Sequence, residues 1–148
     1  MQKLSNQILD LRELEKLAIN LSKDISAGDI CLFQGELGAG KTTFIRLLIN
    51  NLYVSNNIPK PSSIISPTYP ILITYELRTS LIYHYDLYRV KNLKELEELD
   101  FFENLNNNIT FIEWPEMLIN LPLNKKHYLI NLDMISETKR KINISFNQ

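Results

Sequence analysis

The sequence predicts an α/β fold, in which helices cover both faces of a central, mostly parallel sheet and antiparallel strands lie at its edges. Two apolar runs, residues 29–34 and 109–114, are typical of strands that are buried on both faces. Between them, residues 41–53 keep a helical spacing of apolar side chains. The last run, residues 141–147, alternates apolar with polar residues, as a strand with one solvated face does.

The chain length favours one domain. With 148 residues, 45% of them apolar, the chain can bury one core, whereas two independent domains would each lack buried surface. We therefore expect a single domain over residues 1–148.

The N-terminal third predicts a helix, a strand and a second helix. Apolar side chains recur at helical spacing over residues 11–21, which indicates an amphipathic helix that ends near Lys23. Ser5 and Asn6 are its capping candidates. The break "SAGD" then leads into the first buried strand, and a glycine-containing loop leads from that strand into the second helix.

A loop and a strand pair are predicted in the middle of the chain. Four prolines and several serines punctuate residues 58–70, which cannot continue a helix or a strand and should form a surface loop. Residues 71–77 and 80–88 are rich in β-branched and aromatic side chains and are separated by polar residues. This pattern predicts two paired strands.

Helical spacing returns at residues 92–105, which predicts one further helix before the second buried strand. Pro115 can open a short helical turn after that strand. The two C-terminal apolar runs, residues 127–133 and 141–147, are both expected at an antiparallel edge of the sheet.

Composition excludes several classes of function. The net charge of −1 and the pI near 6.1 provide no strong field to hold a polyanion, so direct binding of nucleic acid is disfavoured. No signal-peptide core and no apolar run of about 18 residues is present, so we expect a cytoplasmic protein without a membrane segment. The single cysteine, Cys31, lies in a buried-type run and is expected to be a packed thiol.

Three of the four glycines lie between Gly35 and Gly40, directly before Lys41 and Thr42. They satisfy G-x-x-x-x-G-K-[ST] between a predicted strand and a predicted helix, which is the context that this phosphate-binding loop (P-loop) requires. Backbone N–H groups turned inward around a phosphate leave little room for side chains and need φ values that glycine adopts easily. Lys41 would reach the β- and γ-phosphates, and the Thr42 hydroxyl would bind Mg²⁺. The motif therefore predicts a P-loop NTPase-like fold.

Two acids stand where a phosphate-bound Mg²⁺ would need them. Asp86 and Glu113 each follow an apolar run, at the strand ends where the ligand crevice of a parallel sheet lies. Mg²⁺ prefers oxygen ligands, so at least one of the two acids is expected near the metal. Glu113 can instead orient or deprotonate the attacking water, and the sequence leaves the division of roles open.

Four segments together resemble the bacterial TsaE family, the ATPase subunit of the machinery that forms threonylcarbamoyladenosine in tRNA. They are "GELGAGKTT", "SPTYPILITYE", "YHYDLYR" and "FIEWPE", and the resemblance covers roughly residues 30–116. It implies a Mg²⁺-dependent ATPase that is weak alone and that binds two partner proteins. These partners would install threonylcarbamoyl on an adenosine beside the anticodon, so the chain would meet tRNA only indirectly.

The resemblance also implies a set of site residues. Lys41, Asp86 and Glu113 would be catalytic, and Thr42 would share the metal with the two acids. Ser66, Pro67 and Thr68 resemble a switch loop that senses the γ-phosphate, and Trp114 resembles the tryptophan beside the catalytic acid, although its alternative role is to anchor the core. The residues expected to contact ATP are Glu36, Leu37, Gly38, Ala39, Gly40, Lys41, Thr42, Thr43, Ser66, Thr68 and Trp114. Where a glycine would be expected after "LKELEEL", this chain has "DFFENLNNN".

Other readings remain open from the residues alone. A small-molecule kinase shares the P-loop, but such kinases close an arginine-rich lid that this chain lacks; a nucleotide-switched adaptor would use hydrolysis only as a reset. Arg89 either stabilises the transition state, an effect of about 10³- to 10⁵-fold in P-loop hydrolases, or forms a surface ion pair. "NKKH", residues 124–127, has a histidine where guanine recognition needs a carboxylate, so it is interpreted as a polar loop before a strand. The expectation of ATP comes chiefly from the resemblance to the TsaE family. His84 is interpreted as a packed strand residue, not a metal ligand.

Overall fold

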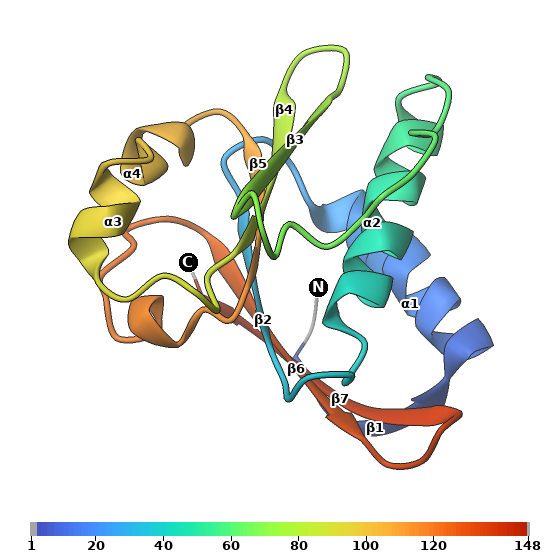
Figure 1. Cartoon of the computed structure of the whole chain (residues 1–148). Coiled ribbons are helices and arrows are strands. Elements are labelled where there is room, and N and C mark those ends of the chain that lie inside the picture. The colour runs from blue at the N-terminus through green and yellow to red at the C-terminus, as the bar shows by residue number, and fades with distance from the viewer. Residues whose placement is uncertain (1–2, 148) are drawn as a thin grey trace.

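The computed structural model describes residues 3–147, and within them seven strands form one mixed sheet (Figure 1). Its spatial order is β1-β7-β6-β2-β5-β4-β3. The strands are β1 (Leu4–Asp10), β2 (Ile30–Gln34), β3 (Leu72–Glu76), β4 (Leu81–Asp86), β5 (Ile109–Glu113), β6 (His127–Met134) and β7 (Lys139–Asn147). The four central strands, β6, β2, β5 and β4, run parallel, whereas β3, β7 and β1 pair antiparallel to their neighbours. The predicted α/β architecture, parallel in the centre and antiparallel at the edges, is confirmed.

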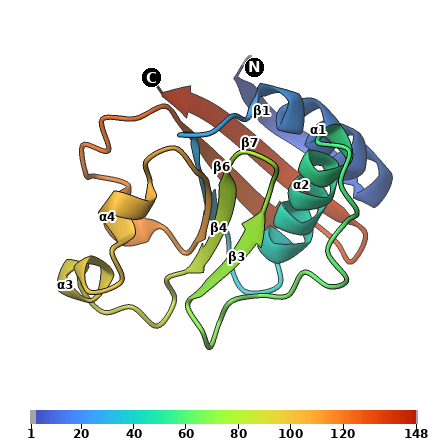
Figure 2. The ribbon, with the colours of Figure 1, turned by 90° about the horizontal axis from the view of Figure 1, so that it is seen from above.

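Helices cover both faces of the sheet, as predicted (Figure 2). On one face lie α1 (Leu11–Asp24) and α2 (Lys41–Ser55), which pack against each other. The other face carries α3 (Leu93–Glu97), α4 (Phe101–Asn104) and the 3₁₀ turn η1 (Glu116–Leu118). Within residues 3–147, none of these helices is both long and apolar enough to cross a bilayer.

Strand β2 shows why the central runs are apolar at every position. Cys31 and Phe33 face the core under α1 and α2, whereas Ile30 and Leu32 face the core under α3, α4 and η1. A strand with helices on both faces has no solvated side, so the alternation of polar and apolar residues disappears. Burial raises the pKa of the Cys31 thiol well above its ordinary value, and the nearby charge of Asp29 acts in the same direction. The expectation of a packed thiol is confirmed.

The N-terminus differs from the prediction. Ser5 and Asn6 do not cap a helix, because both lie in the outermost strand, β1, which pairs with β7. Helix α1 is capped by Asp10 instead: its Oδ1 accepts the N–H of Glu13 at 2.9 Å, and the Glu13 carboxylate accepts the N–H of Asp10 at 2.8 Å. This reciprocal pair is a capping box, which satisfies two backbone donors at the helix start.

The single helix predicted for residues 92–105 is wrong. Two short helices, α3 and α4, replace it, because Asp100 adopts a left-handed conformation with φ 52° between them. Asp is one of the few residues other than glycine that enter this region. Asp100 thus makes the turn for which a glycine was expected, and the turn places Phe101 in the core beneath the sheet.

The C-terminal strands are only partly where they were expected. β6 and β7 do pair antiparallel, but neither is an edge strand, because β6 also pairs parallel to β2 and β1 lies outside β7. The parallel pairing of β6 places its start beside the P-loop strand, in register with residues 30–34. The β6–β7 hairpin (residues 127–147) can therefore reach the candidate site.

Candidate functional site

The P-loop (residues 35–42) joins β2 to α2 and has the backbone that the glycine motif demands. Gly38 and Gly40 have φ values of 81° and 102°, in the region that residues with a side chain rarely adopt. At Gly35 the constraint is space, because an added Cβ would lie 2.5 Å from the carbonyl oxygen of Leu132. No side chain caps the N-terminus of α2 at Gly40, so the first amides of the helix face the loop, where they can bind an anion.

Lys41 is a buried cation held over the loop. Its side chain is 5% exposed, and its Nζ donates to the carbonyl oxygens of Gly35 and Glu36. The same ammonium lies 4.0 Å from the ring centroid of Trp114. Burial lowers the pKa of Lys41, and the nearby carboxylates of Glu113 and Asp86 offset this only in part. A ligand with phosphate oxygens would meet an ammonium that is already in position and whose positive charge is only partly offset by nearby carboxylates.

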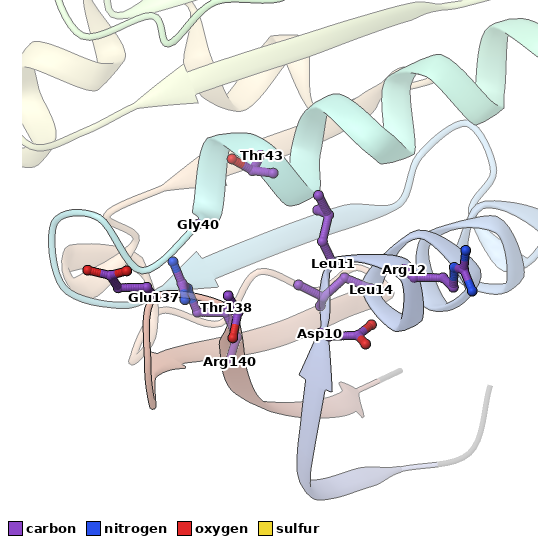
Figure 3. Close-up of a pocket in the computed structure, with 9 residues that line it drawn as sticks. All are labelled: Asp10, Leu11, Arg12, Leu14, Gly40, Thr43, Glu137, Thr138 and Arg140. Atoms are coloured by element: carbon purple, nitrogen blue, oxygen red, sulfur yellow. The ribbon is translucent and has the colours of Figure 1, made fainter.

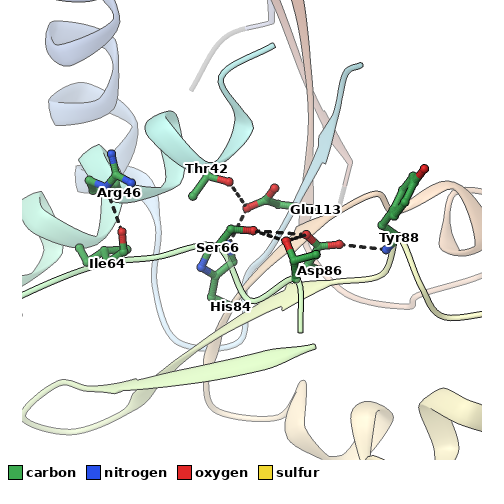
Figure 4. Close-up of polar contacts among 9 residues, drawn as sticks. Thr42, Arg46, Ile64, Ser66, His84, Asp86, Tyr88 and Glu113 are labelled. Atoms are coloured by element: carbon green, nitrogen blue, oxygen red, sulfur yellow. Dashed lines mark hydrogen bonds and ion pairs between the residues drawn. The ribbon is translucent and has the colours of Figure 1, made fainter. Parts of the chain in front are cut away.

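Glu113, at the end of β5, is the centre of a polar cluster (Figure 4). It is 3% exposed, and its Oε1 accepts the hydroxyl of Thr42 at 2.8 Å. The Nε2 of His84 lies 2.8 Å from the same oxygen. Directly after this acid, Trp114 has a φ of 56°, a strained value for a non-glycine residue, and the turn brings its ring under Lys41.

Asp86, at the end of β4, lies beside Glu113 because the two residues pair in register between the parallel strands. Its Oδ2 accepts hydrogen bonds from the Thr68 hydroxyl at 3.2 Å and the Ser66 hydroxyl at 3.4 Å, and its Oδ1 accepts the N–H of Tyr88 at 2.9 Å. The acid therefore ties the switch loop (residues 66–68) to the strand end (Figure 4). No group of three or more His, Cys, Asp or Glu side chains suited to a metal occurs within residues 3–147. The oxygens available to a cation here are those of Thr42, the two acids and a bound ligand.

Arg89 holds the switch loop from outside. Its Nε donates to the carbonyl oxygen of Thr68 at 2.8 Å, a second guanidinium nitrogen donates to the carbonyl oxygen of Tyr69, and the guanidinium lies 5.3 Å from the Tyr69 ring. Arg89 is exposed and does not line the cleft described below. Of the two roles that the sequence left open, the surface ion pair is not formed within residues 3–147, since the side chain donates to backbone carbonyls of the switch loop. The role at the transition state stays a prediction.

The predicted contact residues surround one cleft of about 680 Å³ between the P-loop, the switch loop and the ends of β4 and β5. The sequence-predicted residues that line it are Glu36, Leu37, Gly38, Gly40, Lys41, Thr42, Thr43, Ser66, Thr68, Asp86, Glu113 and Trp114. Ala39 is the exception, because its side chain packs into the core beneath the loop.

Two residues of the cleft were not predicted. Tyr88 lines it with its ring centroid 4.9 Å from that of Trp114, and its place in "DLYR" was the available signal. Arg140 comes from β7, and its Nε donates to the carbonyl oxygen of Ala39 at 2.8 Å. No local pattern marks Arg140, since it is 101 positions from its partner.

A second pocket, of about 460 Å³, lies between the start of α1, the start of α2 and the β6–β7 hairpin (Figure 3). Both pockets share Gly40, Thr43 and Arg140, so they meet at the start of α2. The second pocket is bounded by the β1–α1 junction, with Asp10 and Leu11, and by the turn of the β6–β7 hairpin.

Comparison with known proteins agrees with this geometry. The family model described as "Threonylcarbamoyl adenosine biosynthesis protein TsaE" matches residues 8–142. The chain belongs to the TsaE family. The TsaE protein of Rickettsia felis is 42% identical over 135 residues, which cover 91% of this chain and 75% of the relative. The TsaE protein of Aquifex aeolicus is 32% identical over 145 residues, 97% of this chain and 98% of the relative.

A solved structure has the same fold. YdiB of Bacillus subtilis superposes with a TM-score of 0.66 and 22% sequence identity, over 97% of this chain and 84% of that one. The family match and this likeness agree with the P-loop NTPase-like fold that the glycine motif predicted. For this member of the TsaE family, the match also spans the P-loop, the switch loop and both acids, since all lie within residues 8–142.

Proposed function

We propose that this chain is a Mg²⁺-dependent ATPase that supports the formation of threonylcarbamoyladenosine in tRNA. The observation that carries the proposal is the cluster at the start of α2, where the hydroxyl of Thr42 donates to Glu113 within the cleft lined by Lys41 and Asp86. Its relatives in Rickettsia felis and Aquifex aeolicus carry the name tRNA threonylcarbamoyladenosine biosynthesis protein.

The cleft fits a nucleoside triphosphate. The free amides at the start of α2 and the ammonium of Lys41 would hold the phosphates, since both supply positive potential in a shielded site. The pocket beyond Gly40 and Thr43 would receive the nucleoside, because it is the space that continues from the loop. The hydroxyl of Thr42 and the carboxylates of Glu113 and Asp86 are the hard oxygen donors that Mg²⁺ prefers. When bound, Mg²⁺ would neutralise charge on the phosphates and on the leaving group.

We assign the two acids different roles in hydrolysis. Both hydrogen bonds to Glu113 end on Oε1, and within residues 3–147 none ends on Oε2. Oε2 is therefore the atom that we assign to orient the attacking water and to accept its proton. Asp86 would serve the metal and would report its presence to the switch loop through Ser66 and Thr68.

A partner would complete the site. Apolar side chains stand exposed around the mouth of the cleft: Leu37 is 90% exposed, Tyr69 85% and Tyr88 66%. Arg89 is engaged with the switch loop, and Arg140 donates to the carbonyls of Ala39, Ser136 and Lys139, so neither is free to stabilise a transition state. We therefore infer weak turnover by the chain alone and stimulation by two protein partners, which also provide the contact with tRNA.

The test measures ATP hydrolysis by the purified chain with Mg²⁺, first alone and then with the two partner proteins of the tRNA-modifying machinery. The expected result is slow turnover alone, a large increase with the partners, and loss of turnover in Glu113→Gln with nucleotide binding retained. Transfer of the γ-phosphate to a metabolite in preference to water would overturn the proposal in favour of a kinase. Repeated rounds of tRNA modification with a non-hydrolysable ATP analogue would overturn it in favour of a nucleotide-switched adaptor.

A further inference from the structure

We propose that His84 is a positioning residue for Glu113: its Nε2–H bonds to Oε1 of the carboxylate and directs Oε2 into the cleft. This inference rests on the proposed ATPase function. His84 is 0% exposed, and Figure 4 shows it between the end of β4 and the carboxylate of Glu113, with Nε2 2.8 Å from Oε1. It does not line the cleft, so it can act only through the acid.

The direction of the bond follows from the partners. An ionised carboxylate can only accept hydrogen bonds, so the proton must be on Nε2 of His84. The other ring nitrogen, Nδ1, is buried and has no hydrogen-bond partner within the part of the chain that the structure describes. Nε2 is therefore the ring nitrogen that we assign to carry the proton of this bond.

Two donors on one oxygen fix the carboxylate of Glu113. The hydroxyl of Thr42 reaches Oε1 from α2, and His84 reaches it from β4, the strand next to Glu113 in the sheet. The Thr42 hydroxyl is also the group assigned to Mg²⁺, which it can bind through an oxygen lone pair while its O–H still donates to the acid. His84 is the donor on Oε1 that has no such second role, because it does not line the cleft.

The surroundings of His84 make it a rigid support. In register, it lies between Ile73 of β3 and Phe111 of β5, on the face of the sheet covered by α2. An imidazole packed between neighbours on both sides can orient the carboxylate from outside the cleft. Donors of this kind, behind a catalytic or metal-binding group, are typically worth about 10- to 100-fold in activity.

The test compares His84→Gln with His84→Met. The glutamine side chain has an N–H donor at a similar reach, whereas methionine has a similar length and no donor. Hydrolysis is measured with the two partners present, together with the affinity for the non-hydrolysable ATP analogue and the melting temperature. We expect kcat to fall about 10- to 100-fold in His84→Met with little change in affinity, and to recover in large part in His84→Gln. Wild-type turnover in His84→Met, or an equal loss in both variants, would overturn the proposal.

A second readout separates this inference from the ATPase function. The chain has two histidines, His84 and His127, so nitrogen-15 NMR of histidine-labelled protein without nucleotide gives two ring systems, and His84→Gln assigns them. We expect the protonated nitrogen of His84 to be Nε2 and its resonance to move strongly in Glu113→Leu. A proton on Nδ1, or an unmoved resonance, would refute the positioning role even if ATP hydrolysis is found. Conversely, if the chain gives the expected spectrum but does not hydrolyse ATP, the proposed function is refuted and the bond between His84 and Glu113 is still supported.

Discussion

Replacing Lys41 with methionine should separate binding from stability. The ammonium is buried over the P-loop, donates to two backbone carbonyls and has a pKa that burial lowers. A lowered pKa means that the fold disfavours the charged form relative to water. The substitution keeps most of the aliphatic stem and removes the charge. We therefore expect a melting temperature no lower than that of the wild type, and a large loss of affinity for ATP.

The size of the affinity loss follows from the contacts. In the free chain Lys41 makes two hydrogen bonds to neutral carbonyl oxygens, and with ATP it would exchange them for bonds to phosphate oxygens. A hydrogen bond to a charged group is worth about 1.5–3 kcal/mol and one between neutral groups about 0.5–1.5 kcal/mol. Two exchanges therefore contribute about 2–3 kcal/mol, so the dissociation constant of Lys41→Met for ATP should be roughly 30- to 150-fold larger than that of the wild type.

Fluorescence provides the assay. The chain has a single tryptophan, Trp114, whose ring carries the Lys41 ammonium at 4.0 Å. A nucleotide that draws the ammonium away from the ring should change the fluorescence emission of Trp114. Because Lys41→Met has no ammonium to move, the affinity of this variant is measured by calorimetry. Lys23→Met, on the exposed side of α1, is the matched control and should change nothing. An affinity of Lys41→Met within about threefold of the wild type, roughly 0.7 kcal/mol, would refute the assignment of Lys41 to the phosphates.

The pH dependence has a defined sign. Between the lowered pKa of Lys41 in the fold and its ordinary value of 10.5, the unfolded chain binds more protons than the folded chain. The contribution of Lys41 to the free energy of unfolding therefore rises with pH through this window. Lys41→Met lacks this rise, so any advantage in stability that it has at neutral pH should shrink as the pH approaches 10.5. A constant or growing difference in urea unfolding would contradict the buried charge.

Three further substitutions test the fold around the site. Gly35→Ala places a Cβ 2.5 Å from the Leu132 carbonyl oxygen and should lower the free energy of unfolding by about 2–3 kcal/mol. In Gly38→Ala the added Cβ meets nothing within 4 Å, so this variant should lose only about 1 kcal/mol, through its positive φ. Equal losses of the two variants in urea unfolding would contradict the close approach at Gly35. Asp10→Ala removes the cap of α1 and should lower stability by about 1 kcal/mol, a drop of about 3 °C by calorimetry. Arg89→Ala should speed hydrogen exchange in the amides of residues 66–71 and leave the melting temperature nearly unchanged, because the hydrogen bonds of Arg89 hold only that loop. Slow exchange of these amides in the variant would show that the loop is held by other contacts.

What could be predicted from the sequence was local. The strand, glycine loop and helix around Lys41 follow from signals within about fifteen consecutive residues, and the two acids follow from strand ends. β1 could not be predicted, because its strand conformation depends on β7, whose paired residues lie about 130 to 140 positions away in the chain. The bond between His84 and Glu113 was missed for a related reason: it depends on the register of β4 against β5, which a single sequence does not state.

The left-handed residues show a second limit. Asp100 and Trp114 both have positive φ values without being glycine, and nothing in the side chain of Trp114 favours this conformation. In this conformation its ring contacts Tyr88 and Lys41. Strain of this kind is found where packing over-determines the backbone, often at functional sites, and it has no signature in composition or periodicity.

The P-loop is braced by the end of the chain. Gly35 packs beneath the Leu132 carbonyl, Arg140 holds Ala39, and β2 is paired on one side by β6. During synthesis on the ribosome, which proceeds from the N-terminus, residues 35–42 therefore leave the exit tunnel long before the strands that shape them. We expect this loop to bind nucleotide only after these strands have been made, and a chain that ends before Arg140 to carry the glycine motif without the contacts that support it.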